Sequence, residues 1–306
     1  MPASCPAAQD AFFLAGPTAV GKTSVALALA EACGGEIVGA DAFQLYQGLD
    51  LLTAKPSPAE LARVPHHLVG TVPLSDSFNV GRYQQAALKA IAEIRTRGRL
   101  PIVTGGTGLY LRALTRGLAE IPSGSPELRA QLASTPLPEL IERLTALDPN
   151  ADIDFKNPRR VQRALEVCLV TGQPFSSFRR EWAVQPPFHG VLLERPREQL
   201  YARIEARTHE MFAQGVVEEV RETLAGGGIG PTAEQVIGWR EITALLRGEI
   251  SQTQCIAAIQ QATRRYAKRQ QTWFGREPGF RRVSLEADFD LGPILECAAA
   301  VQCSGR

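Results

Sequence analysis

Short apolar segments alternate with helix-forming segments along the N-terminal part of the chain. The segments 11–16 (AFFLAG), 35–41 (GEIVGAD) and 100–106 (LPIVTGG) end at glycine or a carboxylate, which is typical of buried strands. The stretch 22–33 contains helix formers without a breaker, and 79–98 has an amphipathic pattern between a capping asparagine and a glycine stop. This alternation predicts a parallel sheet covered by helices on both faces.

The pattern changes between residues 118 and 187. Strand signals are few there, and successive segments open near a proline or a capping residue and end at a turn residue. These segments are 125–133, 136–149 and 157–172. They predict a mostly helical insertion at 118–187, which divides a core formed by 1–117 and 188–306.

Strand and helix patterns return after the insertion. Residues 189–195 (HGVLLER) have the character of another strand, and 198–228 predict one long helix or a pair of helices. Residues 251–274 predict a further helix, and 280–287 (FRRVSLEA) predict a strand at the edge of the sheet. The tail after Asp288 shows no pattern that predicts an element.

The charge of the chain is nearly balanced, with 33 basic and 32 acidic residues, so no overall field favours a nucleic-acid partner. Such a partner would have to use local basic patches. The cysteines form no C-x-x-C pair and are typical of free thiols in a reducing compartment. We find no secretory signal and no apolar run near the ~20 residues of a membrane helix. We therefore expect a cytoplasmic protein with no membrane partner, and its near-uniform charge favours a monomer.

Residues 16–23 (GPTAVGKT) match the phosphate-loop motif G-x-x-x-x-G-K-[ST] and lie between a predicted strand and a predicted helix. Gly16 and Gly21 let the backbone curl so that its N–H groups point at phosphate oxygens. Lys22 adds a positive charge, and the Thr23 hydroxyl can bind Mg²⁺. The motif predicts an α/β fold with a P-loop NTPase-like parallel sheet. Its usual ligands are nucleoside triphosphates, but a magnesium-bound diphosphate presents similar oxygens, so the motif does not identify the ligand. The phosphate-binding residues that it predicts are Gly16, Pro17, Thr18, Ala19, Val20, Gly21, Lys22 and Thr23.

Two further polar residues follow predicted strands. Asp41 stands at the carboxyl end of the second strand, where ligands bind in open α/β sheets. It either caps a local turn or faces the phosphate loop and accepts a proton from a substrate. Thr107 follows the third strand and opens the next helix, so its hydroxyl could hold the same phosphate groups. On its own, the G-G-T-G turn around Thr107 also fits an ordinary helix start.

Together these segments resemble the tRNA dimethylallyltransferases, or tRNA isopentenyltransferases, a family that modifies the adenine beside the anticodon. The resemblance covers nearly the whole chain, because several separate motifs occur in the order found in the family. They are GPTAVGKT, DAFQLYQGLDLLTAKP, PHHL, VTGGTGLYLRAL, NPRRVQRALEV, RIEARTHEM, QVIGWRE and TRRYAKRQQTWF. Ala42, Leu52 and Trp239 depart from the serine, glycine and tyrosine that are usual at these positions.

The resemblance implies that the phosphate loop binds the diphosphate of dimethylallyl diphosphate and that the exocyclic amine of adenine attacks its allylic carbon. It implies catalytic roles for Asp41, Thr107 and Arg207. Asp41 would act as the general base, since an ordinary aspartate is ionised at neutral pH. Thr107 and Arg207 would contact the diphosphate together with Lys22 and a Mg²⁺ cofactor held by Thr23, because negative charge builds on this leaving group.

The target adenine must leave its stack to reach such a site. The resemblance places residues 41–44 and Thr107 against the target nucleotide, and the Gln44 amide can read an adenine edge through two hydrogen bonds. In the insertion, the arginines of 157–163 could contact phosphates of the anticodon stem-loop. The tRNA-binding residues implied are Asp41, Ala42, Phe43, Gln44, Thr107, Arg129, Arg159, Arg160, Val161, Gln162 and Arg163.

Some residues and the function itself have alternative interpretations. Arg203, Arg207 and Glu210 also fit a solvent-exposed ladder on one helix, and His66 also fits a turn histidine that packs locally. A kinase that uses ATP would share the phosphate loop and the carboxylate, but the order of the other motifs favours the transferase. A nucleotide-gated RNA-binding protein is disfavoured because the chain has no N-K-x-D motif. A prenyltransferase acting on free AMP or ADP would not need the insertion.

Overall fold

The computed structural model describes residues 7–118, 121–122, 124–178, 187–227, 229–285 and 290–303. The chain divides into two compact units. The core unit contains Cys5–Thr115 and Pro187–Arg306, and the helical unit contains Arg116–Pro186. No helix in the described part of the chain is long and apolar enough to cross a membrane.

Among the described residues, the core unit contains a six-stranded sheet in the order β3-β2-β4-β1-β5-β6, with all neighbouring strands parallel. The strands are β1 (Phe12–Ala15), β2 (Glu36–Gly39), β3 (His66–His67), β4 (Pro101–Gly105), β5 (His189–Glu194) and β6 (Arg281–Ser284). All predicted strands are confirmed, and β6 lies at the edge as expected. The sequence pattern does not predict β3, because two histidines are too short a stretch to show a period.

Both faces of the sheet are buried under helices. The helices of the core unit are α1 (Ala7–Asp10), α2 (Lys22–Cys33), α3 (Pro58–Arg63), α4 (Val80–Thr96), α5 (Gly108–Arg116), α10 (Arg197–Ala213), α11 (Val216–Ala225), η2 (Ala233–Gln235), α12 (Trp239–Leu246), α13 (Gln252–Phe274) and α14 (Gly292–Cys303). Phe13 of β1 joins a cluster with residues of α4 and α5, and Phe12 joins the opposite cluster with residues of α2 and α14. This alternation confirms the predicted arrangement and explains why the strands are continuous apolar runs.

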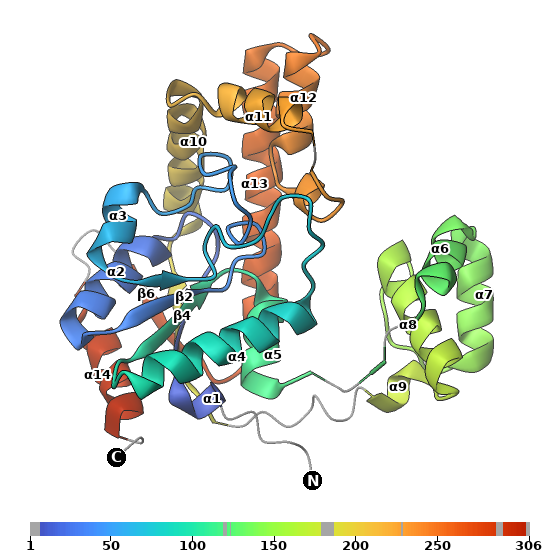
Figure 1. The fold of residues 1–306 in the computed structure, drawn as a ribbon, viewed down its shortest axis with the longest axis horizontal. Helices are drawn as coiled ribbons and strands as arrows, with labels where there is room; N and C mark the ends of the chain where they lie inside the picture. The colour runs from blue at the N-terminus through green and yellow to red at the C-terminus, as the bar shows by residue number, and fades with distance from the viewer. Residues whose placement is uncertain are drawn as a thin grey trace. The chain divides into compact units, whose positions relative to one another are not determined.

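The helices after β5 build a third hydrophobic cluster. Helices α10 and α13 run side by side (Figure 1), and α11 and α12 pack with them. Leu49 and Leu52, from the long connection after β2, are buried in this cluster. The predicted segment 198–228 forms a pair of helices because Gly215, with φ of 96°, adopts the left-handed conformation between α10 and α11. The connection after β2 is thereby anchored on C-terminal helices.

Helices of the insertion pack around their own small core. They are α6 (Pro126–Ser134), α7 (Leu137–Leu147), α8 (Pro158–Thr171) and α9 (Phe175–Phe178). Leu140, Leu144 and Leu165 are fully buried between them. Ser125 and Asn157 cap α6 and α8 by accepting backbone N–H groups, as the sequence signals predict. The helical unit therefore has its own hydrophobic core.

Candidate active site

The phosphate loop joins the end of β1 to the start of α2. Gly16 is required by close packing, because a Cβ atom there would lie 2.9 Å from Val20 Cγ1 and 3.0 Å from the carbonyl oxygen of Leu193. Gly21 is required by its φ of 112°, which side chains other than hydrogen rarely allow. These two glycines shape the loop as the motif predicts.

The Lys22 ammonium is folded back onto its own loop. Its Nζ donates to the carbonyl oxygens of Gly16 (3.0 Å) and Pro17 (2.8 Å). Burial lowers the pKa of Lys22 to about 8, although the nearby Asp41 carboxylate opposes this shift. A phosphate group offers this ammonium a charged acceptor in place of two neutral carbonyls, which favours its protonated form.

A cleft of about 530 Å³ lies beside the phosphate loop. Its walls come from the loop, from the connection after β2 and from α10. The lining includes Thr18, Ala19, Gly21, Lys22, Thr23, Asp41, Gln44, Thr53, Ala54, Lys55, Arg203 and Arg207. The structure therefore brings the predicted base, the predicted magnesium ligand and several of the predicted diphosphate contacts, Lys22 and Arg207 among them, to one cleft.

Asp41 caps a turn and also lines the cleft. Its Oδ1 accepts from the backbone N–H groups of Phe43 (3.0 Å) and Gln44 (3.4 Å). The same carboxylate raises the pKa values of Lys22 and Arg207 against the opposing effect of burial, so its charge acts on both cations. The two interpretations of Asp41 from sequence are thus compatible, because a carboxylate has a second oxygen for a substrate.

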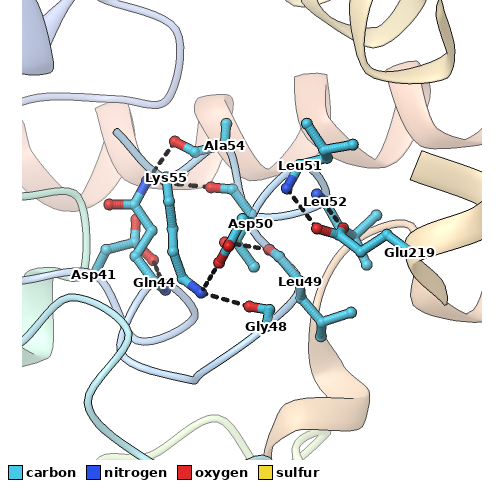
Figure 2. Close-up of polar contacts among 11 residues, drawn as sticks. Asp41, Gln44, Gly48, Leu49, Asp50, Leu51, Leu52, Ala54, Lys55 and Glu219 are labelled. Atoms are coloured by element: carbon cyan, nitrogen blue, oxygen red, sulfur yellow. Dashed lines mark hydrogen bonds and ion pairs between the residues drawn. The ribbon is translucent and has the colours of Figure 1, made fainter. Parts of the chain in front are cut away.

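The connection after β2 is held by polar contacts along its length (Figure 2). Gln44 Nε2 donates to the carbonyl oxygens of Thr53 (3.1 Å) and Ala54 (2.8 Å). Both amide hydrogens are engaged in the loop, so the expected two-bond contact with adenine would require them to be released. At the other end, the Glu219 carboxylate of α11 accepts from the N–H groups of Leu51 (2.8 Å) and Leu52 (2.9 Å).

Arg207 faces the cleft from α10. Its guanidinium donates to Thr18 Oγ1 at 3.0 Å. Burial lowers the pKa of Arg207, while Asp41 raises it. Arg203 and Glu210 on the same helix are exposed, whereas Arg207 is half-buried against the phosphate loop, so a solvent-exposed ladder does not describe Arg207.

Thr107 connects the turns after β2 and β4. Its Oγ1 accepts from the backbone N–H of Ala42 at 3.0 Å, and the Tyr266 side chain of α13 interacts with Thr107. Thr107 does not itself line the cleft, although Thr104 and Gly105 before it do. His66 also lies outside the lining, and its Nδ1 is 2.8 Å from the carbonyl oxygen of Val64, which fits a locally packed histidine.

Gln270 of α13 was not among the residues that sequence patterns single out. Its side chain is buried and contacts both the phosphate loop and the turn after β4. A neutral residue inside a basic helix gives no chemical signal in a sequence. Only its position on the buried face of the helix, four residues after Tyr266, points to it.

The insertion residues predicted to bind tRNA fall into different environments. Arg129 Nε (2.9 Å) and Arg163 Nη1 (2.8 Å) both contact the carboxylate of the buried Glu166. Burial raises the pKa of Glu166, but these two arginines and the Gly124 N–H outweigh it and lower the pKa. Arg159 and Arg160 are exposed at the start of α8.

Two of the insertion residues predicted to bind tRNA have side chains that contact the helical unit itself. The Val161 side chain is fully buried in the core of the helical unit. A contact of this residue with tRNA stays a prediction. Val161 alternates with exposed arginines because neighbouring positions on a helix lie on different faces. Gln162 Nε2 donates to the carbonyl oxygen of Leu132 at 3.3 Å. The motif includes these two residues only because they lie between the arginines.

Comparisons with known proteins agree on one family. The IPP transferase profile matches residues 44–277. The tRNA dimethylallyltransferase 1 of Citrifermentans bemidjiense is 45% identical over 294 residues, covering 94% of this chain and 96% of the relative. The tRNA dimethylallyltransferase of Phenylobacterium zucineum is 47% identical over 286 residues, covering 90% and 92%.

Solved structures resemble the whole chain as well. The tRNA isopentenylpyrophosphate transferase of Bacillus halodurans has a TM-score of 0.70 and 33% identity, covering 96% of this chain and 97% of its own. A eukaryotic dimethylallyltransferase acting on tRNA has a TM-score of 0.79 and 27% identity, covering 90% and 73%. The family profile spans most of the chain, and the relatives match it nearly end to end. This chain belongs to the IPP transferase family.

Proposed function

We propose that this protein transfers the dimethylallyl group of dimethylallyl diphosphate to the exocyclic amine of the adenine adjacent to the anticodon in tRNA. Diphosphate is the other product. The observation that carries the proposal is the cleft in which Lys22, Arg207 and the phosphate loop face Asp41. Relatives named tRNA dimethylallyltransferase, similar over nearly the whole chain, support it.

The cations of the cleft stabilise the leaving group. As the bond between the allylic carbon and the bridging oxygen breaks, negative charge builds on the diphosphate. The loop N–H groups, Lys22 and Arg207 are already in place to receive this charge. The Arg207 guanidinium can donate to two phosphate oxygens at once, which a lysine cannot do with the same geometry.

Asp41 acts as the general base. As the adenine nitrogen forms its bond to the allylic carbon, it must lose one hydrogen to become a neutral secondary amine. The Asp41 oxygen that is not occupied by the turn accepts this proton. Because an aspartate is a weak base, most of its effect must come from the position in which the turn holds it.

The site also fits Mg²⁺. Its donors are hard oxygens, from the Thr23 hydroxyl and the diphosphate itself, which is the set that Mg²⁺ prefers with few protein ligands. No group of three or more His, Cys, Asp or Glu side chains suited to a metal occurs in the described residues, so the substrate must supply most of the ligands. When bound, Mg²⁺ would neutralise charge on the leaving diphosphate, and Thr23 would hold it.

One assay tests the proposal. The protein is incubated with radiolabelled dimethylallyl diphosphate, Mg²⁺ and either unmodified tRNA, AMP or ATP. We expect label in tRNA only. Label in AMP would instead assign the protein to the prenyltransferases of free nucleotides, and ATP hydrolysis without prenyl transfer would favour a kinase or ATPase.

A further inference from the structure

The buried side chain of Gln270 ties the long helix α13 to the phosphate site. Gln270 is 5% exposed, whereas Gln271 beside it is exposed. Its Oε1 accepts from the backbone N–H of Thr18 at 2.8 Å, and its Nε2 donates to the carbonyl oxygen of Gly106 at 2.9 Å. The amide orientation is fixed, because the flipped amide would place a donor against an N–H and an acceptor against a carbonyl.

The contact leaves no free space around the amide. A Cβ atom on Gly106 would lie 2.3 Å from Gln270 Nε2 and 3.2 Å from the carbonyl oxygen of Gly16. The end of β4, the phosphate loop and α13 therefore meet at this point. A displacement of the glutamine has to move the loop or the turn with it, since packed interiors do not deform freely.

Thr18 is held from two directions. Gln270 accepts from its backbone N–H, and Arg207 donates to its hydroxyl. The N–H that Gln270 occupies is not available to a phosphate, so the later N–H groups of the loop and Lys22 have to bind the diphosphate. Gln270 thus fixes the part of the loop that does not bind anion and so orients the part that does.

The same helix also supports the neighbouring turn. Tyr266, one helical turn before Gln270, interacts with Thr107, which follows Gly106. Thr107 in turn accepts from the N–H of Ala42, next to Asp41. One face of α13 therefore contacts the two turns that flank the cleft.

We propose that Gln270 is a positioning residue that holds the phosphate loop in its diphosphate-binding conformation against the turn after β4. This inference rests on the proposed function for the identity of the allylic substrate. Its physical basis is that a buried, doubly hydrogen-bonded amide couples two loops, and that removing it leaves a backbone donor and a backbone acceptor unpaired. The effect should appear in diphosphate affinity before it appears in tRNA affinity.

The test compares Gln270→Leu with the matched control Gln271→Leu on the exposed face of the same helix. For Gln270→Leu we expect the KM for dimethylallyl diphosphate and the Kd of inorganic diphosphate with Mg²⁺ to rise about 10-fold, the scale of one lost buried hydrogen-bonding partner. We expect the KM for tRNA to stay within about twofold of wild type, because Gln270 hydrogen-bonds to Thr18 and Gly106 and to none of the residues predicted to bind tRNA. Gln271→Leu should change none of these values.

A second variant, Gln270→Glu, covers the case in which the leucine variant does not fold. Glutamate keeps the acceptor for Thr18 but loses the donor for Gly106, and we expect the same selective rise in the Kd of diphosphate. Unchanged diphosphate affinity in the folded variant would overturn the proposal, and so would an equal rise in both KM values. If the wild-type protein transferred no label to tRNA, the proposed function would be refuted. Weaker diphosphate binding by Gln270→Leu would even then support the positioning role of Gln270.

Discussion

At the residue scale, the cations of the cleft hydrogen-bond to uncharged carbonyl and hydroxyl oxygens of the protein. Lys22 donates to loop carbonyls and Arg207 donates to the Thr18 hydroxyl. Burial disfavours the charged form of each, and Asp41 partly compensates. A diphosphate is a stronger acceptor than any of these oxygens, which supports the proposal that these cations bind the diphosphate of the substrate.

The pKa of Lys22 predicts how diphosphate affinity depends on pH. Because the pKa is about 8 in the free protein and bound diphosphate raises it, the contribution of the charged amine is complete below about pH 8. It is lost as the pH rises above that value. Calorimetric titration with diphosphate between pH 7 and 9.5 should show this loss. Lys22→Arg, which stays charged over that range, should show a smaller loss, and equal pH dependence of the two proteins would contradict the assignment.

Asp41→Asn separates the two roles of Asp41. The asparagine oxygen can still accept from Phe43 and Gln44, so the turn should survive, but the amide cannot take a proton. We expect single-turnover prenyl transfer to fall by about 100-fold or more, the usual scale for a general base, with nearly unchanged tRNA Kd. If Asp41→Asn weakened tRNA binding and left the rate from bound tRNA intact, Asp41 would not be the base.

At the element scale, the long connection after β2 depends on a helix far along the chain. The Glu219 carboxylate of α11 accepts from the N–H groups of Leu51 and Leu52 (Figure 2). The side chain of Leu52 is buried in the third hydrophobic cluster. The connection begins with Asp41 and Gln44. Its anchoring therefore affects both the stability of the protein and the shape of the cleft.

Glu219→Ala should weaken this anchor. Two backbone donors lose their acceptor, so we expect the free energy of unfolding in urea to fall by about 1–3 kcal/mol and the KM for tRNA to rise. Glu222→Ala is the matched control, because Glu222 lies on the same helix and is exposed. Equal losses in the two variants would show that the Glu219 contacts contribute nothing specific.

Sequence periodicity predicts the elements that bury continuous apolar runs and misses those that depend on distant partners. The strands β1, β2, β4 and β5 are such runs, and the phosphate loop follows from the spacing of its glycines. Helix α14 is not predicted, although its buried residues Ile294, Ala298 and Val301 have helical spacing. Gln270 and Glu219 are missed because their partners are backbone groups more than 160 residues away. The burial of Val161 is not predicted, because a motif does not show which side of a helix a residue faces.

At the scale of the whole molecule, the helical unit offers a local basic surface on a chain of balanced charge. Arg159 and Arg160 are exposed, while Arg129 and Arg163 are engaged with Glu166.

Substituting alanine for both Arg159 and Arg160 should raise the tRNA KM and lower the salt slope of tRNA binding by about 1 to 2, since each phosphate contact contributes roughly 0.7 to 0.9. Arg143→Ala on α7 is the control, and a salt slope unchanged by the double substitution would show that these arginines do not contact phosphates.

The most direct test of the account is a crystal structure of the protein with diphosphate, Mg²⁺ and an anticodon stem-loop. We expect the diphosphate on the N–H groups of residues 19–23, with Lys22 and Arg207 on its oxygens. We expect the exocyclic nitrogen of the flipped adenine about 3 Å from the Asp41 carboxylate, within hydrogen-bonding distance. A purine docked out of reach of Asp41, or a diphosphate bound away from the loop, would contradict the mechanism.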